Sequence, residues 1–141
     1  VVVINGTRLL SSETLSSTSA PFINMHVGIT PLYRGVHGGY WALTEGNSHL
    51  VGTTIHKVDA GIDTGSIIAQ VRFQITAKDN FATYPYLHVA AGLPVLVRSI
   101  RQAMAGTFNS PPQTSEHLPS RLRFHPTLWQ YLFYRWKKGV K

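Results

Sequence analysis

The chain has 141 residues, 43% of them hydrophobic, which is enough for one domain with a modest core. It has no cysteine, which excludes disulfides and thiolate catalysis and favours a reducing, cytoplasmic location, and no apolar run is long enough for a membrane-spanning helix. Thirteen Lys and Arg against six Asp and Glu give a net charge of +7, so phosphorylated substrates, nucleic acid or an acidic membrane surface are favoured as partners.

The first half of the chain predicts strands, loops and helices in alternation. Val1–Ile4 is a short apolar run that predicts a buried parallel strand, and Ser11–Glu13 begins a short helix with a serine cap. Phe22–His26 predicts the next strand. The glycines and the proline of Gly28–Gly39 predict a loop, and a helix that contains Tyr40–Leu43 follows it.

The second half continues this alternation. Val51–Val58 alternates as a strand does, Ala60–Gly65 predicts a tight turn, and Ser66–Phe73 predicts a further strand. A long helix is predicted over Tyr84–Met104, and we expect Pro94 to kink it or to end its first part. Together these elements predict an α/β fold with a mostly parallel sheet of about four strands and flanking helices.

The composition changes after Gly106, and three units are expected. They are residues 1–107, a linker over residues 108–122, and a basic aromatic C-terminal helix within residues 123–141. Apolar side chains recur at helical spacing in this last helix, at Trp129, Leu132, Phe133 and Trp136. We expect that stripe to pack on the body of the protein. Contact with a membrane surface is an alternative, and the sequence gives no strong indication of nucleic acid.

Three side chains can support acyl transfer to an amine. Asn24 and His26 are two residues apart on a predicted strand, so they point to one face, and Asp63 lies in a glycine-flanked turn. The amide and an imidazolium can donate to a tetrahedral oxyanion, while the carboxylate orients the imidazole and helps to take the amine proton. The histidines do not show the spacing of a metal site, so no metal is expected.

The segments Asn24–His26, Tyr33–Gly35 and Asp59–Gly65, in this order, resemble the signature of the folate-dependent formyltransferases. That family acts on glycinamide ribonucleotide, methionyl-tRNA and amino-sugar nucleotides. The resemblance implies a Rossmann-like fold in which the third predicted strand runs antiparallel. It also implies transfer of a formyl group from 10-formyltetrahydrofolate to a small-molecule amine acceptor, with three catalytic residues: Asn24, His26 and Asp63.

The resemblance implies further contacts as well. The cofactor is expected to lie against Arg8, Leu9 and Leu10 and against Asp59 and Gly61 of the turn. His37 and Arg34 are expected near the acceptor. The chain departs from the family at Gly28, where a serine is common.

The resemblance begins in the middle of the family's domain, because Val1–Ile4 corresponds to a central strand. The elements ahead of it are therefore expected to be missing. Three functions then stay open: formyl transfer, hydrolysis of formyltetrahydrofolate by the same three residues, and a role as a non-catalytic remnant that serves as an oligomerisation or binding module. The strand edge at Val1–Ile4 is expected to be covered by a second copy in a homodimer or by Phe124–Trp136.

Overall fold

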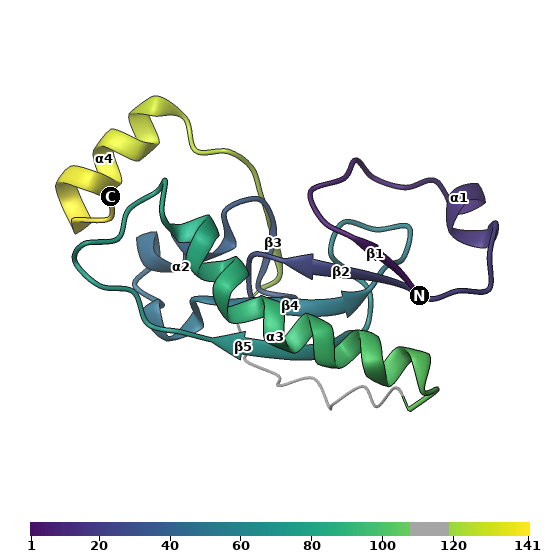
Figure 1. Ribbon diagram of the computed structural model, residues 1–141. Coiled ribbons are helices and arrows are strands. Elements are labelled where there is room, and N and C mark those ends of the chain that lie inside the picture. Colours follow the sequence, from purple (N-terminus) through teal and green to yellow (C-terminus); the bar gives the residue numbers. More distant parts are fainter. Residues whose placement is uncertain (108–118) are drawn as a thin grey trace.

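The computed structural model describes residues 1–107 and 119–141, and a four-stranded sheet forms its centre (Figure 1). The strand order is β1-β2-β4-β5, with bounds Val2–Ile4, Phe22–His26, Gly52–Lys57 and Ile67–Arg72. β1 and β2 are parallel, whereas β4 is antiparallel to both of its neighbours. Three of these four strands share one direction. The α/β fold and the reversed direction of the third predicted strand are therefore confirmed.

Helix α3 (Tyr84–Met104) packs along β4 and β5 on one face of this sheet. Val95 and Leu96 of the helix meet Ile23, Met25 and Ile55 of the sheet in a buried apolar layer. The strand residues alternate along the chain and so point to one face of the sheet, and the helix residues lie on one face of α3. These two apolar faces pack together to form the core.

The helix continues past Pro94, so the expectation that Pro94 ends its first part is wrong. A proline removes the hydrogen bond to the carbonyl four residues earlier. Both Pro94 and Ala90 lie on the exposed side of α3, where water can solvate that carbonyl.

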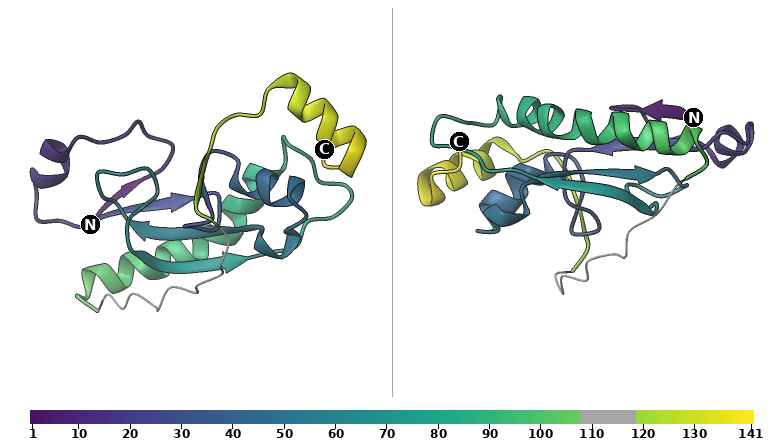
Figure 2. Two further views of the ribbon diagram at one scale, coloured as in Figure 1. Left: turned by 180° about the vertical axis from the view of Figure 1, so that it is seen from behind. Right: turned by 60° about the horizontal axis from the view of Figure 1, so that its bottom comes forward.

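A second group of elements lies at one end of the sheet, on the face opposite α3 (Figure 2). It comprises β3 (Tyr33–Gly35), α2 (Gly38–Thr44), the short helix η1 (Ser48–Leu50), β6 (Arg121–Arg123) and α4 (Leu128–Lys138). β3 and β6 form a two-stranded parallel sheet. The predicted loop Gly28–Gly39 therefore contains a strand, which was missed because its partner comes from the other end of the chain. The short α1 (Ser12–Ser16) lies near β1, capped by the Ser11 side chain.

The C-terminal segment packs on α2 through two tyrosines. Tyr131 stacks on Tyr40, and Tyr134 meets Trp41 edge-on. Trp129 and Trp136 lie on the other side of α4 and are 78% and 82% exposed, so the expectation that their stripe packs on the body is wrong. Most of the expected linker, residues 108–118, falls outside the described residues, and its end overlaps β6. No helix among the described residues is long and apolar enough to cross a membrane.

The outer edge of β1 is not covered by the C-terminal segment. Among the described residues β1 pairs only with β2, and Val1 and Val3 are each 41% exposed. α4 lies at the opposite end of the molecule (Figure 1). The alternative in which Phe124–Trp136 covers this edge is therefore wrong, because that segment is held on α2. Dimerisation through β1 stays a prediction.

The close approach of α3 to the sheet gives a test of the fold at Gly92. A Cβ at this position would lie 2.7 Å from Thr53 Cγ2 and 2.9 Å from Met25 Sδ. We expect Gly92→Ala to lower the free energy of unfolding by about 1–2 kcal/mol in urea denaturation, because overpacking outweighs the gain in helix propensity. On the exposed side of the same helix, Ala90→Gly should cost about 1 kcal/mol through propensity alone. Stabilisation by Gly92→Ala would contradict this packing.

Candidate active site

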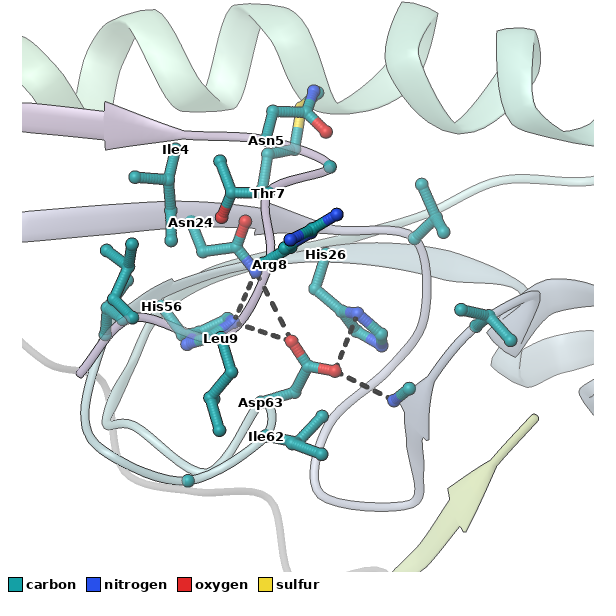
Figure 3. Close-up of a pocket in the computed structure, with 18 of the residues that line it drawn as sticks. Ile4, Asn5, Thr7, Arg8, Leu9, Asn24, His26, His56, Ile62 and Asp63 are labelled. Atoms are coloured by element: carbon teal, nitrogen blue, oxygen red, sulfur yellow. Dashed lines mark hydrogen bonds and ion pairs between the residues drawn. The ribbon is translucent and has the colours of Figure 1, made fainter.

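A cavity of about 490 Å³ opens at the carboxyl ends of the parallel strands β1 and β2 (Figure 3). Ligands of open α/β sheets bind at this position. Its walls come from residues 4–10, from the end of β2, from the loop before α2 and from the turn after β4. Eight of the predicted site residues line it: Arg8, Leu9, Leu10, Asn24, His26, His37, Gly61 and Asp63.

The Asp63 carboxylate lies at the centre of the polar cluster. Its Oδ2 accepts a 2.8 Å hydrogen bond from the Gly35 backbone N–H and lies 3.3 Å from His26 Nδ1. Its Oδ1 accepts from Asn24 Nδ2 at 3.3 Å and lies 3.5 Å from His56 Nε2. The carboxylate thus joins the turn to β2, β3 and β4 (Figure 3).

The backbone carbonyl of Lys57 fixes the tautomer of His56. His56 Nδ1 lies 2.7 Å from that oxygen, which can only accept, so Nδ1 carries the proton. Nε2 is then an acceptor for Asn24 Nδ2 at 3.1 Å. Asn24 therefore donates both amide hydrogens, one to His56 and one to Asp63, and its orientation is set. Its side-chain oxygen makes neither of these bonds.

His56 was not among the predicted site residues. His56 reaches the site through the pairing of the strands, since it lies directly opposite Asn24 in the β2–β4 pair. A sequence pattern gives the alternation along each strand but does not give the register between strands.

His26 is a buried imidazole with an acceptor at each ring nitrogen. Nε2 donates to the Tyr33 carbonyl at 2.6 Å, while Nδ1 faces Asp63. Burial lowers the pKa of His26 and outweighs the opposing effects of Asp63 and of the Tyr33 carbonyl. The His26 ring therefore loses its second proton at a lower pH than a free histidine does. When the ring is charged, its two N–H groups can donate to the Tyr33 carbonyl and to the Asp63 carboxylate.

Gly28 makes room for this arrangement of His26. A Cβ at Gly28 would lie 2.5 Å from the Tyr33 carbonyl oxygen and 2.6 Å from His26 Nε2. The departure from the common serine therefore has a steric reason, because any side chain here would push these two groups apart.

Asp63 is ionised at neutral pH. Burial raises its pKa, but the nearby His56 and His26 rings and the Gly35 N–H together lower it below its ordinary value. Its side chain is only 11% exposed, so the Gly35 N–H and the Asn24 amide replace the water that the charge has lost.

Two residues of the site have left-handed backbone. Asp63 has φ +52° and His37 has φ +57°, and they are the non-glycine residues with positive φ in the part of the chain that the structure describes. Such backbone is uncommon outside glycine and concentrates at functional sites. His37 Nε2 lies 3.0 Å from Nδ1 of His125, a cavity residue from the C-terminal segment that the sequence did not indicate.

Two predicted residues support the turn and do not line this cavity. Asp59 accepts hydrogen bonds from Gly61 N–H at 3.0 Å and from the Thr64 hydroxyl at 2.7 Å. Arg34 donates to the Ile62 carbonyl at 3.4 Å and lines a smaller hollow of about 220 Å³, which Asp63 also lines. Within residues 1–107 and 119–141, no three His, Asp or Glu side chains are placed to hold a metal ion.

The chain belongs to the formyl transferase family, because residues 1–92 match that family's sequence pattern. A methionyl-tRNA formyltransferase of Thermodesulfovibrio yellowstonii is 32% identical over 116 residues, which are 82% of this chain and 37% of that protein. The chain therefore spans little more than a third of the length of this relative.

Solved structures agree with this assignment. The formyltransferase PseJ of Anoxybacillus kamchatkensis, solved with a UDP-linked formamido sugar and tetrahydrofolate, has a TM-score of 0.69 at 22% identity, covering 87% of this chain and 62% of that one. An N-formyltransferase of Helicobacter canadensis, solved with folinic acid and dTDP-3-aminofucose, has a TM-score of 0.61 at 27% identity, covering 72% of this chain and 37% of that one. The fold is that of the family.

The contact between Asp63 and His26 can be tested by titration. Because the Asp63 charge raises the pKa of His26, we expect Asp63→Asn to lower that pKa further, so that the ring stays neutral to a lower pH. NMR titration of the imidazole would measure this, with His26→Gln identifying the resonance. Asp59→Asn, in the same turn but bonded to Gly61 and Thr64, should leave the His26 titration unchanged. An equal response to both variants would contradict the contact.

Proposed function

We propose that the cavity binds 10-formyltetrahydrofolate and that the protein transfers the formyl group to an amine. The observation that carries this proposal is the Asp63 carboxylate, which is held by the Gly35 N–H and lies against both His26 and Asn24. Membership of the formyl transferase family and the folates named in two solved relatives support the same conclusion.

The folate fits the wall formed by residues 4–10 and by the turn after β4. Leu9 and Ile62 are 63% and 42% exposed, and both line the cavity, so they offer apolar surface to an aromatic ring system. Backbone groups beside them can bind the ring's polar edge. The formyl carbon would then lie near Asn24 and Asp63.

The amine attacks the formyl carbon, and the carbonyl oxygen becomes an oxyanion. The Asn24 amide and the protonated His26 ring donate to that oxygen, for which each of them gives up one of its two protein acceptors. The amine proton passes through Asp63 to the folate nitrogen as the bond between that nitrogen and the formyl carbon breaks. The products are a formamide and tetrahydrofolate, with no net gain or loss of protons.

The acceptor is proposed by class only. One relative is named for methionyl-tRNA, and one solved relative holds dTDP-3-aminofucose, so both compounds belong in the assay. The chain spans 37% of the first relative, and the activity of a whole formyltransferase is therefore itself part of this proposal.

The assay is release of tetrahydrofolate from 10-formyltetrahydrofolate with each acceptor. We expect His26→Ala to lower the transfer rate by about 100-fold to 1,000-fold, since loss of one oxyanion donor typically costs about 2.7–4 kcal/mol. The control is His49→Ala, because His49 lies on η1 and does not line the cavity. Full activity of His26→Ala would contradict the assignment.

The same assay separates the alternatives. Release of tetrahydrofolate that does not depend on an amine would indicate hydrolysis. Binding of the folate without release in either condition would indicate a non-catalytic remnant.

A further inference from the structure

Helix α4 has one side that packs on the protein. Tyr131 and Tyr134 contact aromatic side chains of α2, and Lys138 Nζ donates to the Thr44 carbonyl of α2 at 2.6 Å. Because residues three and four positions apart lie on the same side of a helix, these contacts all come from one side of α4. The opposite side takes no part in them and faces solvent.

The solvent-facing side of α4 is aromatic and aliphatic. Trp129, Leu132, Phe133 and Trp136 are all exposed, and their helical spacing puts them in one stripe along the helix, which we call the aromatic face. A single exposed apolar side chain is ordinary on a protein surface. A contiguous group of large ones usually marks a surface that another molecule covers.

Positive charge lies along both margins of the aromatic face. Arg135 and Lys137 precede and follow Trp136, and successive residues are about 100° apart around a helix, so one cation lies on each side of the face. The chain contains no Asp or Glu after Glu116. The basic residues that follow Glu116 are Arg121, Arg123, Arg135, Lys137, Lys138 and Lys141.

Two of these cations have uncharged partners. Arg135 Nη1 donates to the Tyr131 hydroxyl at 3.0 Å, and Lys141 Nζ donates to a backbone carbonyl at 3.1 Å. Arg123, by contrast, pairs with Glu45. A neutral partner orients a cation without cancelling its charge, so the segment after β6 attracts anions.

Helix α4 is folded before any partner binds. At its start the Thr127 N–H donates to Gln130 Oε1 at 2.9 Å and the Gln130 N–H donates to Thr127 Oγ1 at 3.2 Å, which is a capping box. Its end is closed by Gly139 in the left-handed conformation. An isolated helix of 11 residues is marginal in water, but this helix is held on α2, so binding through the aromatic face has no backbone to order.

The charge and the composition of the aromatic face favour one kind of partner. A second copy of the chain would bring one set of Lys and Arg side chains against another, since residues 119–141 include no acidic side chain. A nucleic acid would need cations among the aromatic rings, whereas here the cations lie at the margins and Leu132 lies within the face. An anionic bilayer suits both features, because Trp, Phe and Leu enter the boundary between headgroups and acyl chains while cations meet the lipid phosphates.

We propose that the aromatic face docks on the surface of a lipid bilayer that contains anionic lipids, with α4 parallel to the bilayer plane. The helix lies at one end of the molecule, where a flat surface can reach it (Figures 1 and 2). The proposal does not depend on the folate or on the formyl acceptor. It gives α4 the role of an anchor that lies on the bilayer and does not cross it.

Binding to vesicles tests the proposal. Vesicles of phosphatidylcholine alone are compared with vesicles of phosphatidylcholine and phosphatidylglycerol, by co-sedimentation and by tryptophan fluorescence. The chain has three tryptophans, and Trp41 is buried, so a blue shift of the emission and quenching by brominated lipids report on Trp129 and Trp136. We expect both signals with the anionic vesicles and much weaker binding to the neutral ones.

Two kinds of variant should weaken this binding. Trp129→Ala combined with Trp136→Ala should lower the affinity at least about 10-fold, because the largest apolar groups of the aromatic face are lost. Lys137→Gln should lower it about 5-fold, since one cation near an anionic surface is worth about 1 kcal/mol. All three side chains are exposed, so the melting temperature of each variant should equal that of the unchanged chain.

The matched controls lie on α3, which ends at the opposite end of the molecule from α4 (Figure 1). Met104→Ala removes an exposed apolar side chain there, and Arg101→Gln removes an exposed cation. Each should change the affinity less than about twofold, because Met104 would not touch the bilayer and the attraction of a cation falls off within a Debye length. Losses equal to those of the α4 variants would reduce the binding to non-specific attraction and overturn the proposal. Absence of binding to the anionic vesicles would overturn it as well.

Two measurements without lipid detect the other possible occupants of the aromatic face. A dimer, seen by light scattering, that dissociates when Trp129→Ala and Trp136→Ala are combined would assign the face to a second copy. Quenching of the same tryptophans by single-stranded RNA, without binding to any vesicle, would assign it to a nucleic acid. Either result would overturn the proposal. An oligomeric state that the two substitutions leave unchanged, together with vesicle binding that they weaken, would support it.

Discussion

The contact on which the site depends is the hydrogen bond from the Gly35 N–H to the Asp63 carboxylate. It joins a left-handed turn after β4 to the strand β3, and so brings the carboxylate over the end of β2. A carboxylate that is only 11% exposed needs donors, and the Gly35 N–H and the Asn24 amide supply them. The orientation of Asn24 and the environment of His26 both follow from this position of the charge.

The pKa of His26 is set by opposing effects. Burial favours the neutral ring, whereas Asp63 and the Tyr33 carbonyl favour the charged ring. An imidazole that is neutral in the free site and has acceptors ready for its charged form can gain a proton at little cost in reorganisation when negative charge develops nearby. Gly28 is needed for the same arrangement, since the absence of a side chain there lets the His26 ring reach the Tyr33 carbonyl.

Much of the fold and of the candidate site could be predicted from the sequence. The features that could not be predicted depend on contacts between residues that are distant in the chain. Alternation and helical spacing identified the four strands of the main sheet and the helices α3 and α4, and the same-face spacing of Asn24 and His26 placed them together. β3 was missed because it needs β6 as its partner, and His56 because it needs the register of two strands. The outward direction of Trp129 and Trp136 was missed because two tyrosines, Tyr131 and Tyr134, hold the opposite side of α4.

The chain belongs to the formyl transferase family, and it spans 37% of the methionyl-tRNA formyltransferase of Thermodesulfovibrio yellowstonii that it resembles. The central claim is therefore that the cavity beside Asp63 is a folate site in this chain as it stands. Calorimetric titration with folinic acid tests this claim most directly. The account predicts saturable binding of one folate per chain together with a higher melting temperature. No heat of binding and no thermal shift would contradict it.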